Sequence, residues 1–507
     1  MAYDVTVIGA GIGGLMCAAM LAKGGKRVVL LEKDRHIGGT SYIFRRGGYV
    51  FPMGPLSFSY PSLVQKLLDQ AGIETEITFT RNHFQLITPF VDIIYSRPFE
   101  EFKGMLHTVF PQEQGIDPLF AEMEGIIALV RDVYRWHPDY LSRCERERMP
   151  ANTKGDFLSM VERVRAYSGT SCSTMLDRYL SDPFLKRLLG SQGTYEPVVS
   201  VLKLASMWNL MSWEGIWFPS CGIHGICDLL RDAFDRHGGE MHTGAPVEEI
   251  LIRDGRAVGV RTAGGRVFES RWVVSNVDYK RTFLDLLDER DAQAAFLERI
   301  KGVPYTGSEL CVYLGIDPKE IDLCRLRATH VFYRHRLDPE AESGPEDFSN
   351  REIEICLWSD NAPDLVPSGK ASMVLRVDLP YEHVAGFRTG EKRRGGGYRE
   401  YKERLAQSLI RTVEGIIPGL GTAIETIEIA TPLTYEDWGH RYRGSIAGWS
   451  WSMEHEGMLG GKILVHTPVG HLLMVGIYAV SELFLGGVPS AMHTACLASD
   501  IILGNAA

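Results

Sequence analysis

The chain has 507 residues, of which 45% are hydrophobic and 23% are charged, so it is long enough for two to four soluble globular domains. Its 54 Lys and Arg residues are outnumbered by 64 Asp and Glu residues, and the net charge of −10 argues against a nucleic-acid partner. The nine cysteines form no CxxC pair and no spacing typical of a disulfide framework or a metal site, which indicates a reducing compartment and no bound metal.

Residues 5–33 predict a dinucleotide-binding βαβ unit. An apolar strand at Val5–Ile8 leads into a glycine-rich turn and a helix, and a second apolar strand at Val28–Leu31 ends at Glu32. The amides at the start of the helix favour a phosphate, and the Glu32 carboxylate is expected to accept hydrogen bonds from a ribose. A 2′-phosphate would be repelled by Glu32, so NADP is not expected at this site.

The glycines of this turn have separate predicted tasks. We expect Gly9 to permit the tight turn and Gly11 to let a pyrophosphate approach the backbone. Gly14 is expected to let the helix pack closely on the sheet. Because strand, glycines, helix, second strand and acid occur in register, the pattern is far more specific than a glycine cluster alone.

Residues 60–215 predict a mostly helical region with one strand-like stretch at His83–Tyr95. The expected helices are Tyr60–Ala71, Phe99–Val109, Ile116–Arg135, Phe157–Ala166 and Ser173–Leu189. The stretch Val199–Phe218 is rich in Trp and Met, and two interpretations of it stay open. It either lines an apolar substrate tunnel or forms an aromatic core patch.

The second half of the chain alternates strands with two long helices. A helix at Ile223–His237 is expected to stop at Gly238. The predicted strands are Val247–Ile252, Ala257–Thr262, Arg266–Phe268, Trp272–Ser275, Glu309–Leu314, Glu352–Trp358, Met373–Asp378 and Ile424–Ala430, with an amphipathic helix near 398–416. A strand at Leu472–Gly476, a glycine turn and a small-residue helix at Ser490–Leu503 are expected to return the chain end to the nucleotide site.

Several short motifs follow one another in a recognisable order. Residues 32–40 read EKDRHIGGT, 51–55 read FPMGP, 218–223 read FPSCGI, 244–248 read GAPVE, 273–278 read VVSNVD, 473–476 read LMVG and 486–489 read GGVP. Together they resemble the phytoene desaturase, carotenoid isomerase and retinol saturase superfamily. The resemblance is strong over the FAD-binding half and thin over 80–215 and 285–430. Residues 431–435 (TPLTY) and 444–449 (GSIAGW) are most similar to the isomerase and saturase branch.

The resemblance implies an α/β fold with a glutathione-reductase-type FAD-binding Rossmann-like domain, a mixed α+β substrate domain and a helical cap. The FAD-binding domain is expected to be discontinuous, over 1–80, 215–285 and 456–507, with the cap at 81–214 and the sheet-containing substrate domain at 286–455. The residues expected to bind FAD are Gly9, Gly11, Gly13, Gly14, Glu32, Lys33, Arg35, Gly38, Gly39, Thr40, Gly54, Pro55, Leu56, Val247, Asn276, Gly476, Gly487 and Val488.

The resemblance also implies a reaction on the carbon–carbon bonds of a long apolar isoprenoid or polyene, by desaturation, saturation or flavin-dependent cis–trans isomerisation. Alternatives are an amine-oxidase-like flavoenzyme and a non-catalytic isoprenoid-lipid carrier of the same fold. We expect a cytoplasmic protein that associates peripherally with the inner membrane surface to reach its substrate. No single side chain is assigned a catalytic role, because a flavin carries out the redox step itself.

Three departures from the family pattern bear on the site. The family has an acid soon after the glycine of its last strand, whereas this chain continues Gly476-Ile477-Tyr478, so the usual contact to the ribityl chain lacks its acid. Pro52 stands where the family often has Asp, and Cys221 replaces a glycine.

Overall fold

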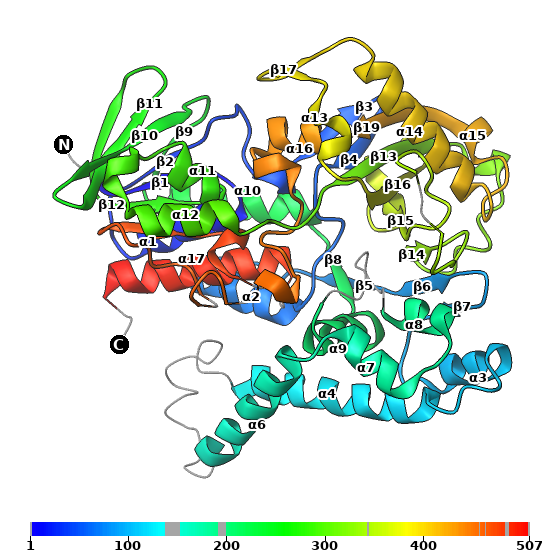
Figure 1. Cartoon of the computed structure of the whole chain (residues 1–507). Coiled ribbons are helices and arrows are strands. Elements are labelled where there is room, and N and C mark those ends of the chain that lie inside the picture. The colour runs from blue at the N-terminus through cyan, green and yellow to red at the C-terminus, as the bar shows by residue number, and fades with distance from the viewer. Residues whose placement is uncertain are drawn as a thin grey trace.

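The fold is built around two sheets, with a group of helices beneath the second one (Figure 1). The computed structural model describes residues 3–136, 153–190, 199–341, 344–455, 457–461, 463–481 and 486–504. The first and last described segments lie together, and the termini emerge on the same side of the molecule. The α/β class and the FAD-domain architecture predicted from the sequence are confirmed.

The first sheet has parallel strands at its centre. β1 (Tyr3–Ile8) pairs in parallel with β2 (Val28–Leu31) and β12 (Val267–Ser275). The parallel strands β9 (Glu240–His242) and β20 (Leu472–Met474) lie outside them. The sequence predicted two strands over 266–275, but the structure has a single strand there, β12. The first part of β12 pairs antiparallel with β11 (Arg256–Thr262), which in turn pairs antiparallel with β10 (Val247–Arg253).

Three helices from distant parts of the chain pack on this sheet. α1 (Ile12–Lys23) lies between α10 (Gly222–Arg236) and α17 (Gly487–Leu503), and α2 (Pro61–Gln70) packs on α17. Ten of the 12 residues of α1 are buried, so the helix is apolar on nearly every side. The C-terminal helix is therefore part of the layer that supports the first glycine turn.

The second sheet has the order β19-β13-β16-β15-β14-β6-β7. Its strands are β6 (Phe84–Ile87), β7 (Asp92–Ile94), β13 (Glu309–Ile316), β14 (His330–Tyr333), β15 (Ile353–Leu357), β16 (Ala371–Asp378) and β19 (Ile424–Ala430). One face packs under α14 (Tyr398–Val413) through an apolar core. Two small hairpins lie beside the sheets, β3 (Ile43–Arg46) with β4 (Tyr49–Pro52) and β17 (Arg388–Gly390) with β18 (Arg393–Arg394).

Helices of the central region form a cap with its own core. They are α3 (Glu100–Val109), α4 (Ile116–Trp136), α6 (Thr153–Ser168), α7 (Cys172–Tyr179), α8 (Pro183–Gly190) and α9 (Val201–Asn209). The single helix expected over 173–189 is two helices, because Pro183 cannot continue the first and instead begins the second. Trp208 is fully buried among Tyr95, Phe99 and Phe120.

The range 81–214, predicted as the helical cap and including the strand-like stretch His83–Tyr95, does not lie wholly in the cap. β6 and β7 belong to the second sheet, and β6 pairs in parallel with β14, about 240 residues later. β5 (Phe79–Asn82) pairs instead with β8 (Ile216–Pro219), and these two strands form the link between the cap and the rest of the chain. Local sequence did not indicate this division because β6 pairs with β14 and β5 pairs with β8, and both partners are distant in the sequence.

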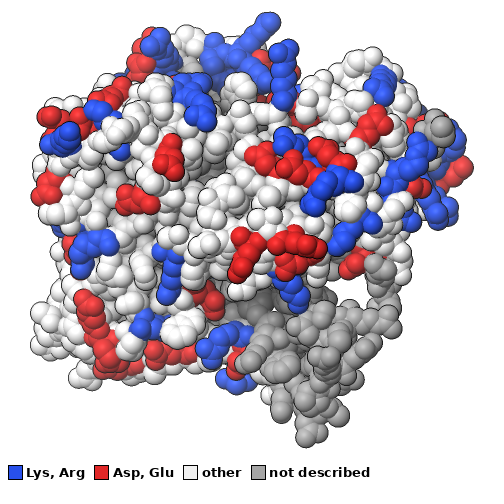
Figure 2. Space-filling view, turned by 180° about the vertical axis from the view of Figure 1, so that it is seen from behind, with Lys and Arg blue, Asp and Glu red and all other residues white. Residues whose placement is uncertain are grey.

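Charged residues are spread over the surface that Figure 2 shows, with Lys and Arg interspersed among Asp and Glu. This distribution accords with the near balance of acidic and basic residues in the sequence. Within the described residues, no helix is both long and apolar enough to cross a bilayer.

The contact between α1 and β1 generates a stability prediction. A β-carbon on Gly14 would lie 2.0 Å from the carbonyl oxygen of Gly9, whereas Gly104 in α3 has nothing within 4 Å. We expect Gly14→Ala to lower stability by about 2–4 kcal/mol because the helix must move off the strand. Gly104→Ala should raise stability by about 0.5–1 kcal/mol through helix propensity alone. Thermal unfolding of both variants measures the difference, and equal unfolding temperatures would contradict the close approach.

Candidate cofactor site and substrate cavity

A cavity of about 430 Å³ opens at the carboxyl ends of β1 and β2, the edge where parallel sheets bind nucleotides. Eleven of the residues expected to bind FAD line it, although they come from five separate segments of the chain. They are Gly9, Gly11, Gly13, Glu32, Lys33, Gly38, Gly39, Thr40, Val247, Asn276 and Gly476.

The first turn of α1 faces this cavity without a competing side chain. Gly11 caps the helix, no side chain accepts its first N–H groups, and the first turn contains no acid. A β-carbon on Gly11 would lie 2.7 Å from Nδ2 of Asn276, which follows the parallel strand β12. The bare backbone at Gly11 therefore leaves room both for Asn276 and for a phosphate at the helix N-terminus.

Glu32 ends β2 inside the cavity wall and is only 6% exposed. Its carboxylate accepts hydrogen bonds from the backbone N–H groups of Ala10 (2.7 Å) and Asp34 (2.9 Å). Burial raises the pKa of this carboxyl above its usual value, and the two backbone donors oppose that shift. A buried carboxylate accepting two N–H bonds has lone pairs left for ribose hydroxyl donors.

The other seven residues that were expected to bind FAD do not line the cavity, and the structure shows where each of them lies. Gly14 packs against β1, and Arg35 is exposed to solvent. Gly54 lies against Thr40, since a β-carbon there would be 2.7 Å from the Thr40 carbonyl oxygen. Pro55 and Leu56 continue the turn at Gly54. Gly487 and Val488 are the first two residues of α17.

Several residues lining the cavity had not been singled out as cofactor ligands. Asp278, Arg281 and Asp285 come from the segment after β12, which includes α11 (Tyr279–Leu284). A second group comes from the end of α16 (Pro432–Gly439) and the residues after it, namely Trp438, Gly439, His440 and Arg441. No local pattern marks the second group, because Trp438–Arg441 reach the nucleotide domain only through the packing of α16.

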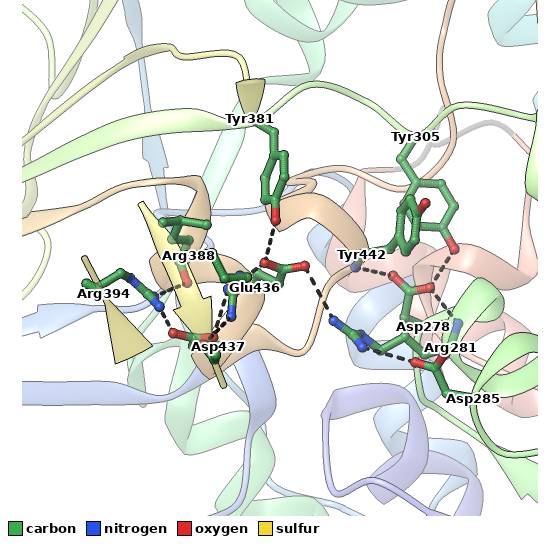
Figure 3. Close-up of polar contacts among 12 residues, drawn as sticks. Asp278, Arg281, Asp285, Tyr305, Tyr381, Arg388, Arg394, Glu436, Asp437 and Tyr442 are labelled. Atoms are coloured by element: carbon green, nitrogen blue, oxygen red, sulfur yellow. Dashed lines mark hydrogen bonds and ion pairs between the residues drawn. The ribbon is translucent and has the colours of Figure 1, made fainter. Parts of the chain in front are cut away.

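Hydrogen bonds and ion pairs join α16 to the nucleotide side of the cavity (Figure 3). Arg281 lies between Asp285 (3.0 Å) and Glu436 of α16 (3.7 Å). Glu436 also accepts a hydrogen bond from the Tyr381 hydroxyl and pairs with Arg388, which further contacts Asp437. The end of α16 is thus held over the cavity from both sides.

Asp278 is the buried centre of a second group of contacts. Its carboxylate accepts hydrogen bonds from the Tyr305 hydroxyl (2.5 Å) and from the backbone N–H of Tyr442 (2.9 Å). Burial raises the pKa of the Asp278 carboxyl, and these donors act against it. Tyr305 packs against Trp449 and Tyr478, so an aromatic wall stands next to the position where the family has its acid.

His440 lies at the cavity with a positive φ of 50° directly after α16. Burial, together with the nearby cations Lys33 and Arg281, lowers the pKa of this imidazole to about 4. The ring is therefore neutral at physiological pH, and it covers the cavity without adding charge.

A second cavity of about 450 Å³ lies on the side of the second sheet. Its described lining is mainly charged and polar: Arg187, Arg334, Arg351, Arg376, Glu309, Glu352, Asp378, Ser308 and Asn350. Arg376 joins the two regions, because its guanidinium also donates to the carbonyl oxygen of Gly54. The family resemblance places that turn beside the flavin.

Buried charges at this cavity pair across neighbouring strands. Arg376 lies 3.6 Å from Glu309 of β13 and 3.7 Å from Glu354 of β15. Burial acts to lower the pKa of the Arg376 guanidinium, but the two carboxylates outweigh it and hold that pKa well above its usual value. The Tyr435 hydroxyl donates to Glu309 at 2.6 Å, and His330 contacts Glu354 at 3.0 Å.

The two cavities described above do not correspond to the apolar tunnel that the stretch Val199–Phe218 could have lined. Neither cavity takes its lining from Val199–Phe218. Trp208 and Met211 instead fill the cap core, and Phe218 packs on Trp358. The aromatic-core interpretation of this stretch holds for Trp208 and Met211, whose core also contains Phe84 and Leu86 of β6 and Phe332 of β14.

The comparisons with known proteins cover nearly the whole chain. Residues 12–503 match the flavin-containing amine oxidoreductase family. The chain belongs to this family. It is 29% identical over 391 residues to the zeta-carotene-forming phytoene desaturase of Myxococcus xanthus, covering 75% of this chain and 72% of that protein. It is 26% identical over 469 residues to the chloroplastic prolycopene isomerase of Arabidopsis thaliana, covering 87% and 74%.

The solved structures agree with this assignment at the level of the fold. A crystal structure of an oxidoreductase from Methanosarcina mazei matches with a TM-score of 0.63 at 18% identity, over 97% of this chain and 99% of that one. The predicted superfamily, the FAD cofactor and the oxidoreductase class are confirmed. The residues present also fit FAD, since the uncapped helix, the bare Gly11 and the buried Glu32 suit a dinucleotide.

The position of Glu32 predicts a measurable loss of cofactor affinity. Glu32→Ala should weaken FAD binding about 10- to 100-fold, because a charged hydrogen-bond acceptor is lost from the cavity. Glu240→Ala on the neighbouring strand β9 is the control, since Glu240 pairs with Tyr3 and His242 outside the cavity. Flavin fluorescence titration measures both affinities. Equal affinities for the two variants would mean that the nucleotide lies elsewhere.

Proposed function

We propose that this protein is a FAD-dependent oxidoreductase acting on the carbon–carbon bonds of a long isoprenoid or polyene. The observation that carries the proposal is the extent of the similarity. The ranges predicted to bind FAD make up less than half of the chain, yet the alignment to the Arabidopsis isomerase covers 87% of it. Similarity to enzymes named for carotenes therefore extends beyond the cofactor domain into the substrate side.

The chain's own residues support orientation and water exclusion more than acid–base chemistry. Bound FAD supplies a two-electron redox centre, which removes the need for a protein nucleophile. Trp438 and His440 cover the nucleotide cavity, and Arg376 links the turn at Gly54 to the substrate side. Alignment of substrate and cofactor in such a site contributes many kcal/mol to the rate.

A second candidate function is oxidation of a polar, heteroatom-bearing substrate. The specific observation in its favour is the charged and polar lining of the second cavity, which offers more hydrogen-bonding groups than a pure hydrocarbon can use. The amine-oxidase-like alternative from the sequence belongs here. The non-catalytic carrier has no such support, because the glycines that a dinucleotide would contact are present and line the cofactor cavity.

An anaerobic flavin assay separates the possible reactions of the polyene. Phytoene or zeta-carotene in detergent should bleach the oxidised flavin absorbance if the enzyme desaturates, and reduced flavin should be reoxidised by lycopene or retinol if it saturates. Isomerisation should change the chromatographic isomer pattern of prolycopene with no net change in flavin redox state. No response to any of these lipids, with FAD bound, would contradict the polyene proposal.

Tyr435→Phe separates the two candidate functions in the same assay. A hydrocarbon offers no heteroatom to protonate, so turnover of a polyene should fall less than about 10-fold, below the 10²–10⁴-fold of a true acid–base group. Complete loss of turnover with FAD still bound would favour the polar substrate, because Tyr435 contacts Glu309 at the charged cavity.

We also propose that the protein is cytoplasmic and associates peripherally with the inner membrane surface. An apolar polyene partitions into lipid, and the cap exposes Leu158 (64%) and Trp213 (53%). Liposome flotation should recover the wild type in the lipid fraction, with less recovery after Leu158→Ser and Trp213→Ser together. Val267→Ser, at an exposed position on β12, is the control. Absence of the wild type from the lipid fraction at low and moderate salt would contradict membrane association.

A further inference from the structure

The cations of the nucleotide cavity are not equally neutralised. Lys33 lies 2.6 Å from Asp34, and Arg281 lies 3.0 Å from Asp285. Arg441, the third cation in the lining, has no carboxylate within 4 Å among the described residues. A partly buried guanidinium without a counterion is costly unless a ligand supplies the negative charge.

The hydrogen bonds of Arg441 go to neutral oxygens only. One guanidinium nitrogen donates to the carbonyl oxygens of Ser445 and Ile446, and the other donates to Oγ1 of Thr40 at 2.9 Å. Glu309, a nearby acid beyond 4 Å, is already paired with Arg376 and Tyr435. The backbone contacts hold the guanidinium in place, and its charge remains available to the cavity.

Thr40 puts this charge beside the phosphate end of α1. Thr40 follows Gly38 and Gly39, and Gly38 donates its N–H to the Ala10 carbonyl at 2.8 Å. A β-carbon on Gly39 would lie 3.4 Å from the Cα of Gly11, the capping residue of α1. Arg441 therefore reaches the glycine turn from the substrate side, and the amides of α1 reach it from the sheet side.

We propose that Arg441 binds the pyrophosphate of FAD and that the segment Trp438–Arg441 closes the cofactor cavity from the substrate domain. Of the two cations expected from the sequence to bind FAD, Lys33 is paired with Asp34, and Arg35 is exposed and outside the lining. A guanidinium presents paired N–H donors that match two phosphate oxygens, so it suits this ligand better than a lysine. The contacts of Arg281 and Arg388 with α16 position the segment. The inference concerns the cofactor and holds for either candidate substrate.

The test is a comparison of phosphate-bearing and phosphate-free ligands on the full-length protein after removal of FAD. Arg441→Ala should weaken FAD and ADP about 10- to 100-fold and leave adenosine unchanged, because only the phosphate contact is lost. Arg441→Lys should recover part of the affinity, since it keeps the charge but not the paired donors. The salt dependence of FAD binding should also become shallower in Arg441→Ala.

Arg443→Ala is the matched control, because Arg443 lies two residues further on, is 48% exposed and pairs with Glu382. It should bind all three ligands as the wild type does. Equal loss of ADP and adenosine affinity in Arg441→Ala would show a structural role only, and FAD affinity within twofold of the wild type would overturn the proposal. If the alanine variant does not fold, the ratio of ADP affinity to adenosine affinity is measured for Arg441→Lys and for Thr40→Val instead. A ratio equal to that of the wild type in both variants would overturn the proposal.

Discussion

The close approach of α1 to the end of β1 is the contact on which the rest of the structure depends. A glycine at position 14 brings the helix against the Gly9 carbonyl, and Asn276 fills the space between the turn and Gly476. Because β1, β12 and β20 are parallel neighbours, this one position gathers residues from the beginning, middle and end of the chain. A nucleotide site at this edge exists only when all three segments are in place.

The substrate domain is tied to this site through buried charges rather than through apolar packing alone. Arg281 and Arg388 hold α16 from opposite sides, and Arg376 connects the second sheet to the turn at Gly54. Taking one member away from such a buried group would leave an uncompensated charge, which costs about 3–5 kcal/mol. These contacts therefore resist movement of the substrate domain relative to the nucleotide domain, and they hold the two cavities at a fixed distance and orientation.

The charged face of the second sheet also constrains the substrate. Strand alternation turns Leu310, Val312 and Leu375 toward α14, and it turns Glu309, Glu354 and Arg376 toward the cofactor side. A polyene bound there would cross a surface of paired ions at one end and apolar side chains elsewhere. The ion pairs on this face are already satisfied by one another, so they shape the surface that a substrate meets on the cofactor side of the second sheet.

The sequence alone determined the nucleotide unit and the family, because the strand, glycines, helix and acid of residues 5–33 are close in the chain and each has a local physical task. It also located most helices and strands, including the return of the C-terminus to the first sheet. It did not assign β6 to the second sheet, it left the surroundings of Trp208 open, and it gave no sign of the charge facing Thr40. β6 needs a partner about 240 residues away, Trp208 is apolar in either environment, and Arg441 is 401 residues from Thr40. Only the tertiary structure could decide these, because burial, pairing and counterion placement are properties of neighbours in space that no local pattern records.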